Sequence, residues 1–253
     1  MTNISLNPVA IRELVNTTGI VLGRIKYSET SVIARIYTRH FGLQSYLLKG
    51  VRSSKSKIKM NLLGHLSLVE IVVYHSERSQ LQHLKQIRSA YNYTSIPFDV
   101  RKSSIALFLN EILNKSIIEV EPSPNLFDFI VNTIQIFDVM EEHFSDFHLL
   151  FMLQLSKHLG FYPRENFTAF QPVFDLKEGL FRAGIPNHPD FIDTPLSENF
   201  FRLLNTGFNE MAGLKISTET RRQLLETLIT YYGLHLPSFK DIKSHEVLKV
   251  VLG

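Results

Sequence analysis

Seven basic side chains lie close together in the first quarter of this chain, in a pattern that could bind phosphate. Clustered Lys and Arg gain affinity for nucleic acid by displacing counterions condensed on the phosphates, and exposed aromatic rings add stacking on bases. The interval between Glu29 and Glu70 contains no acidic residue, and its cations are interleaved with Tyr37, Phe41 and Tyr46. We predict a nucleic-acid-binding surface with Tyr37 and Tyr46 as candidate stacking residues, Phe41 in the core, and these candidate phosphate ligands: Arg35, Arg39, Lys49, Arg52, Lys55, Lys57 and Lys59.

Other chemistries find little support in the residue types and their spacing. The chain has no Cys, which removes disulfides, thiolate metal sites and Cys nucleophiles. Its ten His show no metal-ligand spacing, and His40, His65, His75 and His83 lie apart in the sequence. Gly-rich phosphate loops and the Gly-x-Ser-x-Gly motif are missing from the sequence. We therefore expect no catalytic residues, no metal, no cofactor and no small-molecule substrate.

Charge and aromatic residues divide the chain into two parts. Residues 1–95 carry 13 Lys plus Arg and 4 Asp plus Glu, a net charge of +9, whereas residues 96–253 carry 14 and 20, a net charge of −6. Six of the nine Tyr lie in the first part, and 18 of the 19 Phe lie in the second. Two domains with different cores explain this shift, and the basic one is expected to contact phosphate.

The first part contains short segments rich in Val, Ile and Tyr that predict five strands and hence a small barrel. Alternation along residues 31–38 places Val32, Ala34 and Ile36 on one face and Arg35, Tyr37 and Arg39 on the other. Residues 52–59 lack an apolar period and are expected to form a loop. The predicted strands are residues 19–26, 31–38, 43–51, 66–75 and 81–91, the last of which also fits a helix.

Helical periodicity dominates after Pro97, and Asp99 is a suitable helix N-cap. Residues 147–155 are apolar on nearly all sides, so this helix is expected at the centre of its domain. Five Pro in residues 162–195 predict irregular structure with a strand pair around 173–181. No apolar run is long enough for a membrane span, and we expect a cytoplasmic protein. The predicted organisation is an extension at 1–16, a barrel domain at 17–95 and an all-α helical domain at 96–253.

Several sequence strings resemble the RecO family of DNA repair and recombination mediators, in a form similar to that of Bacteroidetes. In the first part these are TGIVL (18–22), YTRHFGL (37–43) and KGVR (49–52). In the second part they are SIPFDVRKSS (95–104), LGFYP (159–163) and YYGLHLP (231–237). Together the strings extend the resemblance over roughly residues 17–252.

This resemblance implies an α+β multidomain protein with an N-terminal five-stranded oligonucleotide-binding (OB) barrel followed by helices. It implies a non-catalytic, nucleoid-associated protein that binds single- and double-stranded DNA, anneals complementary strands, and with RecR assists RecA loading onto DNA coated by single-stranded-DNA-binding protein (SSB). The acidic, Phe-ending SSB tail would need an apolar pocket with a cation at its rim, for which Lys157 and His158 are candidates. Many relatives hold a four-Cys zinc module where this chain has residues 162–195, so its lack of Cys predicts no zinc.

Three other functions remain open at the level of sequence. An RNA-binding barrel would use the same cations, so competition between DNA and RNA is needed to separate the two. A non-catalytic adaptor could use the basic patch to bind an acidic protein, and oligonucleotides would then fail to bind at physiological salt. A hydrolase would show turnover on phosphodiester substrates.

Overall fold

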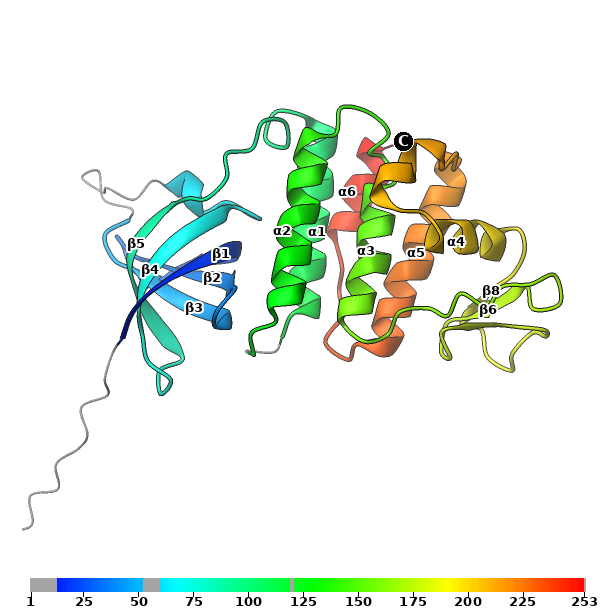
Figure 1. The fold of residues 1–253 in the computed structure, drawn as a ribbon, viewed down its shortest axis with the longest axis horizontal. Coiled ribbons are helices and arrows are strands. Elements are labelled where there is room, and N and C mark those ends of the chain that lie inside the picture. The colour runs from blue at the N-terminus through cyan, green and yellow to red at the C-terminus, as the bar shows by residue number, and fades with distance from the viewer. Residues whose placement is uncertain (1–12, 52–59, 119–120, 253) are drawn as a thin grey trace, which may run out of the picture. The chain divides into compact units, whose positions relative to one another are not determined.

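The computed structural model describes residues 13–51, 60–118 and 121–252, which divide into two compact units (Figure 1). One unit contains the described residues up to Asn92 together with residues 121–127. The other contains residues 93–118 and those from Asp128 onward. Strands predominate in the first unit and helices in the second.

The first unit is a closed five-stranded barrel with the strand order β1-β2-β3-β5-β4. Strands β3 and β5 pair in parallel, while the other neighbours are antiparallel. This closure leaves few unpaired strand edges, and it is the arrangement of an OB-type Greek-key barrel. The strands are β1 (Glu13–Lys26), β2 (Val32–Thr38), β3 (Gly42–Leu48), β4 (Leu68–His75) and β5 (Leu81–Ser89), with a short helix η1 (Met60–Leu63) before β4.

Alternating side chains fill the barrel, as the sequence pattern predicts. Val32, Ala34 and Ile36 of β2 belong to the core cluster, together with apolar residues of β1, β3 and β4. Gly19 of β1 is required by close packing, since a Cβ there would lie 2.5 Å from the Ile36 Cγ2 atom. The fifth segment forms a strand and not a helix, because its backbone completes the ring between β3 and β4.

Strand β1 starts six residues earlier than predicted. Residues 13–16, which sequence reasoning assigned to an N-terminal extension, pair with residues 72–75 of β4. Glu13, Leu14 and Asn16 are exposed in the barrel, so these positions carry only a weak periodic signal. Their strand conformation follows from backbone pairing with a segment nearly 60 residues away.

The second unit is helical. Helix α3 has five consecutive fully buried apolar residues, Leu149–Leu153, and this confirms its predicted place in the core. Among the described residues, no helix is both long and apolar enough to cross a bilayer. The helices are α1 (Val100–Ser116), α2 (Pro124–Val139), α3 (Phe147–His158), α4 (Leu196–Leu204), η2 (Phe208–Gly213), α5 (Thr218–His235) and α6 (Ser244–Val251).

The helical unit is not entirely α-helical, because the Pro-rich segment contains a three-stranded sheet. Its order is β7-β6-β8, with β6 (Val173–Asp175), β7 (Leu180–Arg182) and β8 (Phe191–Ile192). The pair β6 and β7 was predicted, and β8 was not. Buried Asp175 organises this sheet: its carboxylate accepts hydrogen bonds from the Lys177 and Glu178 amides and from Arg182.

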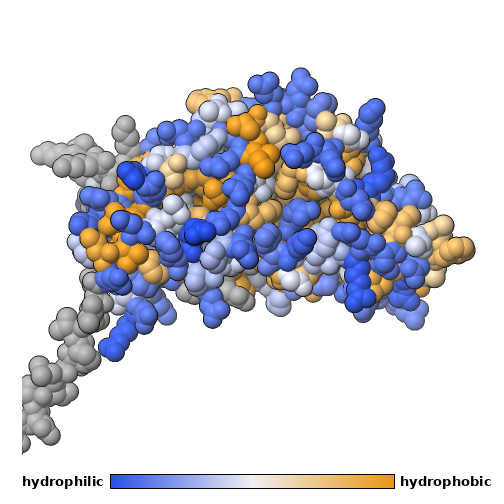
Figure 2. Space-filling view, in the orientation of Figure 1, coloured by the Kyte–Doolittle hydropathy of each residue, from blue (hydrophilic) through white to orange (hydrophobic). Residues whose placement is uncertain are grey.

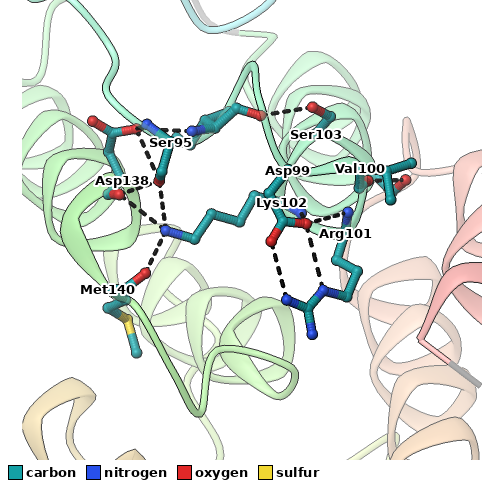
Figure 3. Close-up of polar contacts among 10 residues, drawn as sticks. Ser95, Asp99, Val100, Arg101, Lys102, Ser103, Asp138 and Met140 are labelled. Carbon is teal, nitrogen blue, oxygen red and sulfur yellow. Dashed lines mark hydrogen bonds and ion pairs between the residues drawn. The ribbon is translucent and has the colours of Figure 1, made fainter.

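A buried polar cluster connects the start of α1 with the end of α2 (Figure 3). Asp99 caps α1 as predicted, through the amides of Arg101 and Lys102. The Lys102 ammonium, 3% exposed, donates to Ser95 Oγ and to the backbone carbonyls of Asp138 and Met140. The Asp138 carboxylate accepts from the amides of residues 94, 95 and 96. The cluster therefore satisfies backbone groups at a helix end that would otherwise be buried without partners.

Candidate nucleic-acid interface

Three of the seven predicted phosphate ligands lie along one β-hairpin of the barrel. Arg35 is in β2, Arg39 follows β2, and Lys49 follows β3. Because β2 and β3 are antiparallel and Val32 pairs with Leu48, Lys49 lies beside Ser31, at the opposite end of the hairpin from Arg39. The nine residues from 31 to 39 span about 26 Å, a length that can follow several phosphates. We call Arg35, Arg39 and Lys49 the hairpin cations.

Of the hairpin cations, Arg35 is within a strand and points outward from the barrel, because its position has the parity opposite to the core residues Ala34 and Ile36. Arg39 and Lys49 lie in the turns that directly follow β2 and β3. Lys49 is exposed, whereas Arg35 and Arg39 are half-buried. Partial burial lowers the pKa of Arg35 below its ordinary value, although a guanidinium remains charged at neutral pH. A partly desolvated cation of this kind interacts with an anion more strongly than a fully hydrated one.

Arg52, Lys55, Lys57 and Lys59 lie outside the described residues. Their role as phosphate ligands stays a prediction from the sequence.

Tyr37 and Tyr46 are not positioned to stack on bases, and the sequence interpretation of these two residues needs correction. Tyr46 points into the barrel core and is 0% exposed. Tyr37 lies on the outer side of β2 but is 1% exposed, because residues 121–127 cover it. Its hydroxyl donates to the Ser123 carbonyl at 3.3 Å, and its ring centre is 6.1 Å from that of Phe127. Both Tyr are therefore packing residues.

Phe41, which was expected in the core, is half-buried and packs only partly against the core cluster. The ring of His75, at the end of β4, is stacked on Phe41 with a centroid distance of 3.9 Å, and the His40 ring meets Phe41 edge-on at 6.3 Å. The barrel thus has an aromatic pair near its surface that sequence reasoning did not predict.

Two loops at the ends of the hairpin add exposed side chains that are not among the predicted site residues. The β1–β2 loop (residues 27–31) carries Tyr27, which is 59% exposed. The β4–β5 loop (residues 76–80) carries exposed Arg78. Gln82 holds this second loop in place. Its side-chain oxygen accepts a hydrogen bond from the Ser76 amide, and its side-chain nitrogen donates to the carbonyls of Ser76 and Ser79. In OB folds these two loops border the nucleic-acid-binding face. Their position between predicted strands is the sequence signal from which they could have been identified as candidate binding loops.

The residues predicted to receive an SSB tail lie at the end of α3. Lys157 and His158 are both exposed, with the Lys157 ammonium 5.7 Å from the Tyr162 ring centre and the His158 ring stacked on Phe129 at 4.6 Å. Burial and the neighbouring Lys157 charge lower the pKa of His158 below its ordinary 6.5. At neutral pH the pair therefore presents one positive charge, that of Lys157.

Hydrophilic side chains cover most of the face drawn in Figure 2, and apolar side chains gather in several small groups between them. Within the part of the chain that the structure describes, no group of three or more His, Asp or Glu is arranged to hold a metal ion.

A closed OB-type barrel followed in the chain by a helical unit defines an OB-fold protein with a helical C-terminal part. Comparison with known proteins gives the family. The family model described as "Recombination protein O N terminal" matches residues 12–93, and the model described as "Recombination protein O C terminal" matches residues 97–245. The chain belongs to the RecO family and so has a role in DNA repair and recombination.

Relatives from several bacteria are similar over nearly their full length. The DNA repair protein RecO of Flavobacterium psychrophilum is 36% identical over 241 residues, which cover 94% of this chain and 99% of that protein. The protein of the same name from Phocaeicola vulgatus is 34% identical over 93% of this chain and 98% of its own length. The DNA repair protein RecO of Azobacteroides pseudotrichonymphae is 31% identical over 94% of this chain and 99% of its own length.

Proposed function

We propose that this protein binds single- and double-stranded DNA through the barrel and anneals complementary strands as a recombination mediator. The observation that carries the proposal is the set of hairpin cations along one hairpin of an OB-type barrel in a RecO-family chain. Neutralising the phosphates of two strands lowers their mutual repulsion, so that complementary bases can pair. Binding energy alone is sufficient for this role.

We further propose that the helical domain contacts proteins, namely RecR and the C-terminal tail of SSB, and that these contacts assist RecA loading. Support comes from family membership, from the exposed Lys157 ammonium beside the Tyr162 ring, and from the neighbouring His158 ring stacked on Phe129. An acidic tail ending in an aromatic residue has chemistry complementary to a cation above aromatic rings.

The salt dependence of DNA binding tests the role of the hairpin cations. If about five phosphates of a single strand are contacted, log K should fall with log salt with a slope near −3.5. Combining Lys49→Ala with Arg39→Gln removes two contacts, so we expect the slope to become shallower by about 1.4. Fluorescence anisotropy with labelled oligonucleotides from 50 to 300 mM salt measures it.

Lys215→Ala combined with Lys240→Ala is the matched control, since both Lys are exposed in the helical unit. This variant should keep the wild-type slope. An unchanged slope in the Lys49 and Arg39 variant, with an unchanged melting temperature, would refute the assignment of the hairpin cations. A wild-type protein that binds no oligonucleotide at physiological salt would instead refute the proposed function.

A further inference from the structure

A groove at one end of the barrel contains the stacked pair of Phe41 and His75. Its volume is about 780 Å³, within the range of roughly 300–1,000 Å³ typical of small-ligand sites. It lies where the β2–β3 turn and the β4–β5 loop come together, and Arg35 of the hairpin cations also lines it. The aromatic pair is therefore beside the proposed path of the DNA backbone.

The charge of this groove favours a base over a phosphate. Arg35 and Arg78 line it together with the carboxylates of Glu77 and Glu121, so the opposite charges are equal in number when the His are neutral. Of the other hairpin cations, Arg39 lies at the same end of the hairpin and Lys49 at the opposite end, and neither lines the groove. A negatively charged backbone should follow those cations, whereas an uncharged ring gains more from an aromatic surface in a groove without net charge.

The walls can also hydrogen-bond the edge of a base. Ser45 and Gln80 line the groove with a hydroxyl and a side-chain amide. The Gln82 amide holds the β4–β5 loop that forms one wall, so this wall is preorganised. The Nδ1 atom of His75 is buried without a hydrogen-bond partner among the described residues. Polar groups around an aromatic surface are what recognition of an unpaired base requires.

We infer that this groove receives an unpaired base of a DNA strand whose phosphates follow the hairpin cations, and that Phe41 and His75 form its stacking surface. This inference rests on the proposed function. It assigns base stacking to Phe41 and His75 in place of Tyr37 and Tyr46. It also gives the barrel a physical means of holding single strands more tightly than duplex, because bases in a duplex are already stacked and paired.

Two conservative variants test the stacking surface: Phe41→Leu and His75→Leu keep apolar bulk but remove the aromatic face. Stacking on a protein ring is worth roughly 1–3 kcal/mol per base, so affinity for a single-stranded DNA oligonucleotide should fall by about 5- to 150-fold. Duplex affinity and the slope against salt should stay at wild-type values, because no phosphate contact is lost. Tyr74→Leu is the matched control, since Tyr74 is the neighbouring exposed aromatic on β4 and does not line the groove.

Crosslinking of the unaltered protein gives a second measurement that does not depend on folding of a variant. A single-stranded oligonucleotide containing 5-iodo-deoxyuridine should form adducts at Phe41 or His75 on irradiation, as located by mass spectrometry of peptides. Adducts confined to other residues would overturn the inference, as would leucine variants within twofold of wild type on single strands. An equal loss on duplex, or tighter binding of single-stranded RNA than of DNA, would overturn it too. If the wild type binds neither single strands nor duplex, it is the proposed function that fails.

Discussion

At the scale of single residues, several side chains have properties that only their surroundings explain. His148 of α3 is 0% exposed, and its ring meets that of Phe108 edge-on at 5.8 Å. Burial, together with the nearby Arg221 charge, lowers the pKa of His148 to about 3. Arg221 itself forms a largely buried ion pair with Asp146 at 2.5 Å. His148 is thus neutral in the folded protein over the whole physiological pH range.

This neutrality should make stability depend on pH. The folded pKa lies below the unfolded value of about 6.5, so the stabilisation is fully present above pH 6.5 and is lost as pH falls from there toward 3. Between pH 7 and 5 we expect His148 to account for a loss of about 2 kcal/mol in the free energy of unfolding. Urea denaturation of His148→Leu should show a smaller loss, whereas His143→Gln, at an exposed position, should behave as wild type. Equal pH slopes for all three proteins would contradict this account.

At the scale of elements, helix ends are held by side chains from other segments. The carboxylate of Glu111 in α1 accepts hydrogen bonds from the Lys243 and Ser244 amides at the start of α6. The Lys102 ammonium binds carbonyls at the end of α2. Since these carbonyls carry the negative end of the helix dipole, a buried ammonium is the appropriate partner.

Lys102→Met should destabilise the helical unit by about 3 kcal/mol, because it leaves buried carbonyls without a donor. The midpoint of urea unfolding, followed by circular dichroism, measures this loss. The adjacent Arg101→Met removes an exposed ion pair with Asp99 and should cost less than 1 kcal/mol. If the two variants unfold at the same urea concentration, the Lys102 cluster does not stabilise the fold as described.

At the scale of the whole molecule, the two parts of the chain have opposite net charge, +9 over residues 1–95 and −6 over residues 96–253. Because the two net charges are opposite, they suit different partners. We propose that phosphate binds to the barrel and that proteins bind at specific sites on the helical domain. Lys157 is the exposed cation that we propose for the acidic SSB tail, so its contribution can be separated from DNA binding.

Lys157→Glu should weaken binding of an SSB tail peptide roughly tenfold, or about 1.4 kcal/mol, because it places like charges together. Annealing of SSB-coated strands should slow accordingly, while annealing of bare strands remains unchanged. Calorimetric titration and a fluorescence annealing assay give the two readouts. Lys177→Glu, an exposed cation of the β6–β7 turn, is the control. Equal effects of the two variants, or slower annealing on bare DNA, would refute this role of Lys157.

Features that depend on charge and periodicity among neighbouring residues could be predicted before the structure was known. The sequence predicted the run of cations, the five strands, the inward side of β2, the Asp99 cap and the buried helix α3, because each depends on neighbouring residues. Which outward-pointing or strand-end side chains are buried by other segments became clear only from the tertiary structure. Tyr37 has outward parity but is buried by a segment more than 80 residues later, whereas Phe41 meets His75 because two distant strands end at the same place. Exposure depends on packing between distant segments, and no local pattern records it.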